Sequence, residues 1–362
     1  MSAPELSPDK FVLLLPPDSD TATVREVQSA LGVKLTSSEE LGGQVRARDV
    51  LSSNSGLLYK NLQVAIVENV AEDQLRSAAG QAGLPLYWEK ERLFRATQEL
   101  ALLADLRLAL SMVTEQVDAL EAQLRARERE REEQEDERVT WGLRSVGVAG
   151  SAYRGQGISV AVLDSGLFME HPDFAGREIR GRSFVPRADW SLDGSGHGTH
   201  CAGIIAGGKS GENGIRYGVA PEVDLLIGKV LDDAGNGTTG GILDGIDWAL
   251  EKGARVISLS LGAPVAIGAR PSPIFERVGE QALAQNCLIV AAAGNESERP
   301  RQMPRPVNAP ADAESILAVA ALNRQLRVAP FSNAGINAGS GGRIDLAAPG
   351  VNVYSTYSRN AG

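Results

Sequence analysis

The chain has 362 residues, of which 43% are hydrophobic and 23% are charged. These are ordinary values for a globular protein, so they exclude a wholly disordered chain and leave room for two or three domains. The formal net charge of −10 argues against nucleic acid and anionic membranes as partners, because both bind clustered Lys and Arg.

The cellular compartment is predicted from what the sequence lacks. No apolar run reaches the roughly 20 residues that a membrane-spanning helix needs. The apolar run near the N-terminus, residues 11–15, is too short for a secretion signal. Two cysteines, Cys201 and Cys287, are too few for a disulfide framework. We therefore expect a cytoplasmic protein with no membrane partner.

The first predicted domain is a small α+β unit in residues 1–97. Alternating or apolar runs predict strands over 10–15, 62–70 and 86–96, and helical patterns predict helices over 21–32 and 71–81. Strands and helices alternate in the manner of a ferredoxin-like sandwich. This unit contains no His and no Cys, so we expect no catalytic group in it.

A long charged helix is predicted for residues 98–139. Seven apolar residues recur there at alternating spacings of three and four, which is the pattern of a coiled coil: Leu103, Leu106, Leu110, Val113, Val117, Leu120 and Leu124. Residues 125–138 are almost wholly charged, as in a solvated helix. The apolar seam must be buried, and we expect a homodimer, with a hairpin against the first domain as the alternative.

Residues 140–362 read as an α/β domain. They hold 34 of the 40 glycines, so the chain becomes rich in turns. Continuous apolar runs predict buried parallel strands over 158–164, 223–230, 254–261, 287–293 and 316–322. Helices are expected between them over 197–207, 238–253 and 272–286, and a short strand is expected over 351–356. This order predicts a doubly wound parallel sheet, whose functional sites lie at the carboxyl ends of strands.

Three polar residues stand where such a sheet places a functional site. Asp164 ends the first strand in VAVLDSG, His197 opens a helix in GSGHGTHCAG, and Asn295 follows a strand in AAAGNES. Any one of them could cap a turn. Their occurrence at successive strand ends predicts an active site.

These motifs resemble those of the subtilisin-like serine proteases, and the intracellular branch of that family is the most similar. VAVLDSG with HPDF, GHGTHCAGIIAG, SLSLG, AAAGNES, FSNAG and DLAAPG all match family segments, over roughly residues 141–362. The resemblance implies an Asp-His-Ser triad in which His197 acts as the base and Asp164 orients its imidazole. It also implies that Asn295, outside the triad, donates to the oxyanion. His171 and His200 are expected to be structural.

The resemblance also implies how protein or peptide substrates bind. The peptide would add as a strand between residues 232–237 and the segment Ser260, Leu261 and Gly262, while Ala292, Ala293 and Gly294 would line the first pocket. Small pocket residues predict broad, mostly apolar specificity. Asp173 matches a calcium-ligand position of the family, and the loop 210–214 lies where other ligands come from, so a structural calcium ion is expected.

The family's nucleophile, a serine in a Gly-Thr-Ser-Met-Ala stretch, is not found among residues 1–362. We therefore expect this chain to be inactive alone, as a fragment of a protease or, alternatively, as one part of a split or processed enzyme or a non-catalytic interaction protein. Residues 1–97 resemble the family's inhibitory propeptides. About 40 helical residues separate them from the protease domain, which argues against direct occupancy of the cleft, and maturation is expected near residues 139–141.

Overall fold

The computed structural model describes residues 10–16, 21–38, 55–81, 87–96, 139–208, 214–337, 339 and 341–358. The helix predicted for residues 98–138 and most of the loop predicted to bind calcium lie outside these ranges.

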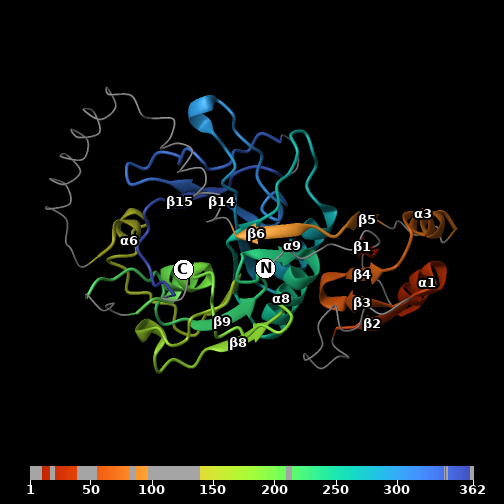
Figure 1. The fold of residues 1–362 in the computed structure, drawn as a ribbon, viewed down its shortest axis with the longest axis horizontal. Coiled ribbons are helices and arrows are strands. Elements are labelled where there is room, and N and C mark those ends of the chain that lie inside the picture. The colour runs from red at the N-terminus through yellow and green to blue at the C-terminus, as the bar shows by residue number, and fades with distance from the viewer. Residues whose placement is uncertain are drawn as a thin grey trace.

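A seven-stranded parallel sheet forms the centre of the C-terminal unit, residues 139–358 (Figure 1). Its strand order is β15-β14-β13-β11-β7-β9-β8. The strands are β7 (Ser159–Asp164), β8 (Arg180–Ser183), β9 (Asp224–Lys229), β11 (Val256–Leu259), β13 (Leu288–Ala292), β14 (Leu317–Leu322) and β15 (Leu346–Pro349). All of their pairings are parallel.

Helices cover both faces of this sheet, which confirms the predicted doubly wound α/β fold. In β7, Ala161 and Leu163 belong to a hydrophobic cluster with helices α8 (Thr239–Glu251) and α9 (Pro273–Ala284). Val160 and Val162 belong to another cluster, with α7 (His197–Ala206). Alternate residues of a strand point to opposite faces, so the continuous apolar run in β7 is the consequence of burial on both sides.

The remaining elements of the C-terminal unit are short. They are α6 (Trp141–Ser145), the 3-10 turns η3 (Pro172–Phe174) and η4 (Arg299–Arg301), and the strands β10 (Asn236–Thr238) and β12 (Leu261–Gly262). The strand expected over residues 351–356 is wrong. This segment packs on α7 through side chains instead, because Ser355 Oγ donates to the His200 carbonyl at 2.7 Å and Thr356 Oγ1 donates to the Thr199 carbonyl at 2.7 Å.

The N-terminal unit, residues 10–96, is built on a five-stranded sheet of order β2-β3-β4-β1-β5. Its elements are β1 (Lys10–Leu14), α1 (Thr21–Leu31), β2 (Lys34–Ser37), β3 (Ser55–Tyr59), η2 (Lys60–Leu62), β4 (Val64–Glu68), α3 (Glu72–Gln81) and β5 (Tyr87–Lys90). One face of the sheet packs on α1 and α3. The other face, including Val12, Leu57 and Ile66, shares a hydrophobic cluster with α8 and α9, so one of the hydrophobic clusters spans both units.

The single strand predicted for residues 86–96 is wrong, because two strands in different sheets occupy it. β5 pairs with β1, whereas β6 (Leu93–Ala96) leaves the N-terminal unit and lies between β10 and β12 of the C-terminal unit. Figure 1 shows β6 reaching away from the rest of the N-terminal unit, across the C-terminal one. The strand is interrupted at Glu91 and Arg92, the two residues between β5 and β6, because they bind the start of α8 instead of a neighbouring strand.

Candidate active site

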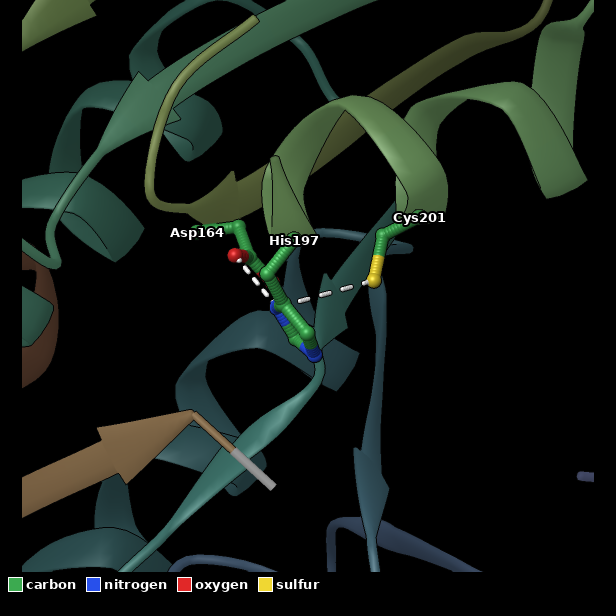
Figure 2. Close-up of side chains that lie close together, drawn as sticks. All are labelled: Asp164, His197 and Cys201. Carbon is green, nitrogen blue, oxygen red and sulfur yellow. Dashed lines mark hydrogen bonds and ion pairs between the residues drawn. The ribbon is translucent and has the colours of Figure 1, made fainter. Parts of the chain in front are cut away.

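Asp164 and His197 form a buried hydrogen-bonded pair. Asp164 is the last residue of β7 and His197 is the first residue of α7. Asp164 Oδ1 lies 2.7 Å from His197 Nδ1, and the two residues are 1% and 5% exposed. Figure 2 shows that the other ring nitrogen points away from the carboxylate. An imidazole held in this way is oriented to accept a proton at Nε2.

Close backbone packing makes this approach of β7 and α7 possible. A Cβ atom on Gly198 would lie 2.2 Å from the carbonyl oxygen of Gly166, so only glycine fits after His197. The GHG sequence is therefore a requirement of packing as well as a family motif.

Ser165 and Asp193 hold the end of β7 against the start of α7. Neither residue was predicted from the sequence. Ser165 Oγ donates to Asp193 Oδ1 at 2.8 Å and accepts from the backbone of Gly198 at 2.9 Å. Asp193 also accepts from the backbone of Gly196 and from both donors of Thr199. Asp193 is 3% exposed. An acidic residue four positions before His197 was the available signal, since carboxylates favour helix N-termini.

The surroundings of His197 stabilise the imidazolium that forms when its ring takes up a proton. Burial opposes the charge, but the Asp164 carboxylate and Cys201 outweigh it and raise the pKa of His197 well above its ordinary value. In contrast, burial lowers the pKa of His200. His200 Nε2 lies 3.1 Å from the Val353 carbonyl, and His171 Nδ1 accepts from the backbone of Asp173 at 3.2 Å.

Asp164, His197 and Cys201 form the one group of three potential metal ligands among the described residues. Cys201 Sγ lies 3.9 Å from the same imidazole nitrogen that binds Asp164 (Figure 2). Because Nδ1 is already engaged by the carboxylate, a metal here would compete with the Asp–His pair.

No helix of the described ranges is long and apolar enough to cross a membrane.

A cavity of about 530 Å³ adjoins the Asp–His pair. The structure brings six of the predicted site residues together on its walls: His197, Ser260, Ala292, Ala293, Gly294 and Asn295. Leu261 and Gly262 lie next to it in β12. Asp173 is not part of this site, because it lies near Gly208, beyond the C-terminal end of α7.

β6 occupies the groove that was expected to bind substrate. It is antiparallel to both neighbours: Gly262 pairs with Arg95 and Leu261 with Ala96 on one side, and Gly237 pairs with Phe94 on the other. The Ala96 N–H also donates to the Gly235 carbonyl at 2.8 Å. The residues between β6 and the C-terminal unit therefore do not prevent direct occupancy of the cleft, contrary to the expectation from sequence.

The side chain of Phe94 anchors this strand. It is fully buried and meets Phe275 of α9 edge-on, with ring centroids 5.5 Å apart. Just before it, Glu91 forms a buried ion pair with Lys10 at 3.2 Å and accepts from the backbone of Gly240 at 3.1 Å. A carboxylate at the first turn of α8 also interacts favourably with the helix dipole.

The fold and the Asp–His pair define an α/β protein with the base of a serine hydrolase. The subtilase family profile matches residues 155–362, which is more than half of the chain, and the chain therefore belongs to this family. The expected likeness to subtilisin-like serine proteases is confirmed.

Individual relatives agree with this assignment. Subtilisin DY of Bacillus licheniformis is 36% identical over 213 residues, which are 59% of this chain and 72% of that protein. The intracellular serine protease of Paenibacillus polymyxa is 38% identical over 207 residues, or 56% and 59% of the two chains. Thermitase of Thermoactinomyces vulgaris is 36% identical over 203 residues, or 56% and 66%. The chain thus matches between about three fifths and three quarters of each relative's length.

Proposed function

We propose that this protein is a serine endopeptidase of subtilisin type that cleaves protein or peptide substrates. The observation that carries the proposal is the buried Asp164–His197 pair, 2.7 Å apart, on the same cavity as Asn295 and Ser260. His197 Nε2 takes the proton of a serine hydroxyl, and Asp164 stabilises the imidazolium that forms. The amide of Asn295 donates to the oxyanion, a contact that contributes about 10²–10³ to turnover in such enzymes.

We propose further that the nucleophile comes from a segment outside residues 1–362. Four serines after Asn295 form hydrogen bonds elsewhere: Ser297 with Asn333, Ser315 with Glu276, Ser332 with Ala321 and Ser355 with His200. The cavity beside His197 is where a serine must come to meet both the base and Asn295.

A fluorophosphonate probe tests this proposal. It should label the protein when the serine-bearing segment is present, on the same chain or on a second one. His197→Ala should abolish labelling, whereas His171→Ala, a change to a histidine that does not line the cavity, should retain it. A protein that stays unlabelled with that segment present would be a non-catalytic interaction protein instead.

We also propose that residues 1–97 are an inhibitory domain and that the boundaries near 97 and 139 separate it and the connecting helix from the protease domain. The proposal is supported by β6, whose backbone pairs with both edges of the cleft as a bound peptide does. Residues 139–141, where maturation was expected, contact other segments of the C-terminal unit: Thr140 N–H donates to the Arg216 carbonyl and Trp141 Nε1 to the Asn352 carbonyl.

Three other expectations remain proposals. A calcium ion would be held by Asp173, whose carboxylate lies close to the backbone of Gly208: a Cβ atom on Gly208 would lie 2.8 Å from Asp173 Oδ1. The helix 98–138 would form a homodimer. A cytoplasmic location is supported by similarity to a relative named as an intracellular serine protease.

A further inference from the structure

Three polar side chains fix the position of the loop that carries Asn295, and none of them has a role in the mechanism above. Glu296, Asn308 and Asn333 come from three separate segments, and we call them the amide–carboxylate cluster. Asn308 is 2% exposed and Asn333 is fully buried.

The cluster binds three consecutive backbone groups of the loop. The Asn333 N–H donates to the Gly294 carbonyl at 3.0 Å. Glu296 Oε2 accepts from the Asn295 N–H at 3.0 Å, and Asn333 Oδ1 accepts from the Glu296 N–H at 3.0 Å. The backbone on both sides of the Asn295 side chain is therefore fixed by one set of contacts.

The cluster is itself closely connected. Asn333 Nδ2 donates to Glu296 Oε2 at 2.7 Å and to the Pro306 carbonyl at 2.8 Å. Asn308 Nδ2 donates to the two oxygens of Glu296 at 3.1 and 3.0 Å. Because every member is held by at least one other, the position of the loop depends on the whole group.

There is no space for the loop to shift toward the cluster. Gly294 has φ +108°, and a Cβ atom on it would lie 2.4 Å from Asn333 Nδ2 and 2.6 Å from Asn308 Nδ2. Asn308 also abuts β12, since a Cβ atom on Gly262 would lie 3.0 Å from its Cβ. The cluster thus sets the spacing between the Asn295 loop and the strand that binds the β6 segment.

Glu296 acts here as a hydrogen-bond acceptor and not as a charge partner. Its carboxylate accepts from neutral amides, and within the described ranges it forms no ion pair. The nearby Arg299 donates to the carbonyls of Ser332 and Asn333 instead. Glutamine, which keeps one acceptor oxygen, should therefore replace Glu296 far better than alanine does.

From these contacts we infer that Glu296 and Asn333 are positioning residues for the Asn295 amide, so that they act on the reaction only through Asn295. The inference rests on the proposed function in one respect, that the Asn295 amide stabilises an oxyanion. Donor placement has a large effect on rate, because a displacement of about 1 Å can cost about 10²-fold.

The first test needs no activity. In the 1–362 chain, Glu296→Ala should speed hydrogen exchange of the Asn295 and Glu296 backbone amides by about tenfold or more, while amides of β13 keep their rates and show that the fold is intact. Glu298→Gln, a change to a more exposed carboxylate that pairs with Arg301, is the matched control and should change neither amide. Unchanged exchange in Glu296→Ala would overturn the inference.

The second test uses the protein with its serine-bearing segment. Glu296→Ala should lower kcat by about 10–100-fold with KM within about threefold, and Glu296→Gln should stay within about threefold of the natural protein. In an Asn295→Ala background, Glu296→Ala should add less than about threefold, since its effect passes through Asn295. Additive losses, or a loss confined to KM, would overturn the inference. If the natural protein cleaves nothing while exchange responds as expected, the proposed function fails and the loop positioning stands.

Discussion

Replacement of Phe94 by alanine should weaken docking of the N-terminal domain in the active-site cleft. Phe94 is fully buried, and the cluster to which it belongs includes residues of α8 and α9. Loss of a buried phenylalanine costs about 3–5 kcal/mol, and each 1.4 kcal/mol corresponds to about a factor of ten in affinity. The inhibition constant of the 1–97 fragment, added to active protease, should therefore rise by at least about a hundredfold.

The matched control is Arg95→Ala, on the same strand but with an exposed side chain, which should inhibit within about threefold of the natural fragment. The fragment's own core between its sheet, α1 and α3 does not include Phe94, so circular dichroism should show that both variants fold. If Phe94→Ala inhibits as tightly as the natural fragment, β6 is not the inhibitory segment. If the natural fragment fails to inhibit at micromolar concentration, the inhibitory domain itself is wrong.

Burial raises the pKa of Asp312 to about 6 from 3.8, so its contribution to folding is greatest when it is protonated, below pH ~4, and is lost as pH rises through about 6. The two-unit shift corresponds to about 3 kcal/mol of unfolding free energy. In urea unfolding, Asp312→Asn should be as stable as the natural protein at pH 4 and more stable than it at pH 8. Equal stability at pH 8 would contradict the shift. Removal of calcium with EGTA should lower the melting temperature of the natural protein but not that of Asp173→Asn, and a chelator effect that persists in this variant would place the ion elsewhere. The double substitution Leu110→Asp and Val117→Asp should convert a dimer to a monomer in sedimentation, because the apolar seam could no longer be buried. A natural protein already monomeric at tens of micromolar would refute the dimer.

The positions of Asp164 and His197 were easier to predict from the sequence than the short strands were. Asp164 and His197 stand in long motifs, and β7 and β13 are apolar on both faces, so their positions at strand ends could be predicted. β8 has the sequence RGRS and lies at the edge of the sheet, where a strand needs no hydrophobic pattern. β2 and β3 were missed as well.

The break between β5 and β6 could not be predicted for a different reason. Residues 86–96 alternate as a strand should, but pattern alone does not say which sheet a strand joins. The choice depends on Glu91 and Arg92 reaching the start of α8, which is distant in sequence. Asp193 and Asn333 were missed for the same cause, since their roles arise from contacts between segments.

If residues 1–97 are inhibitory as proposed, one cleft would hold either a substrate or an inhibitor with the same backbone contacts. β6 forms antiparallel ladders with β10 and β12, and these hydrogen bonds use no particular side chain, so any extended peptide could form them. What distinguishes the N-terminal domain is its additional anchorage: the Lys10–Glu91 pair, the shared core and the hydrogen bond from Tyr59 to Asp244 at 2.8 Å. A short peptide lacks these contacts and leaves after cleavage, whereas β6 is held by the rest of its domain. The proposed inhibition would therefore depend on contacts remote from the cleft, and it should weaken when the domain unfolds even if β6 itself is unchanged.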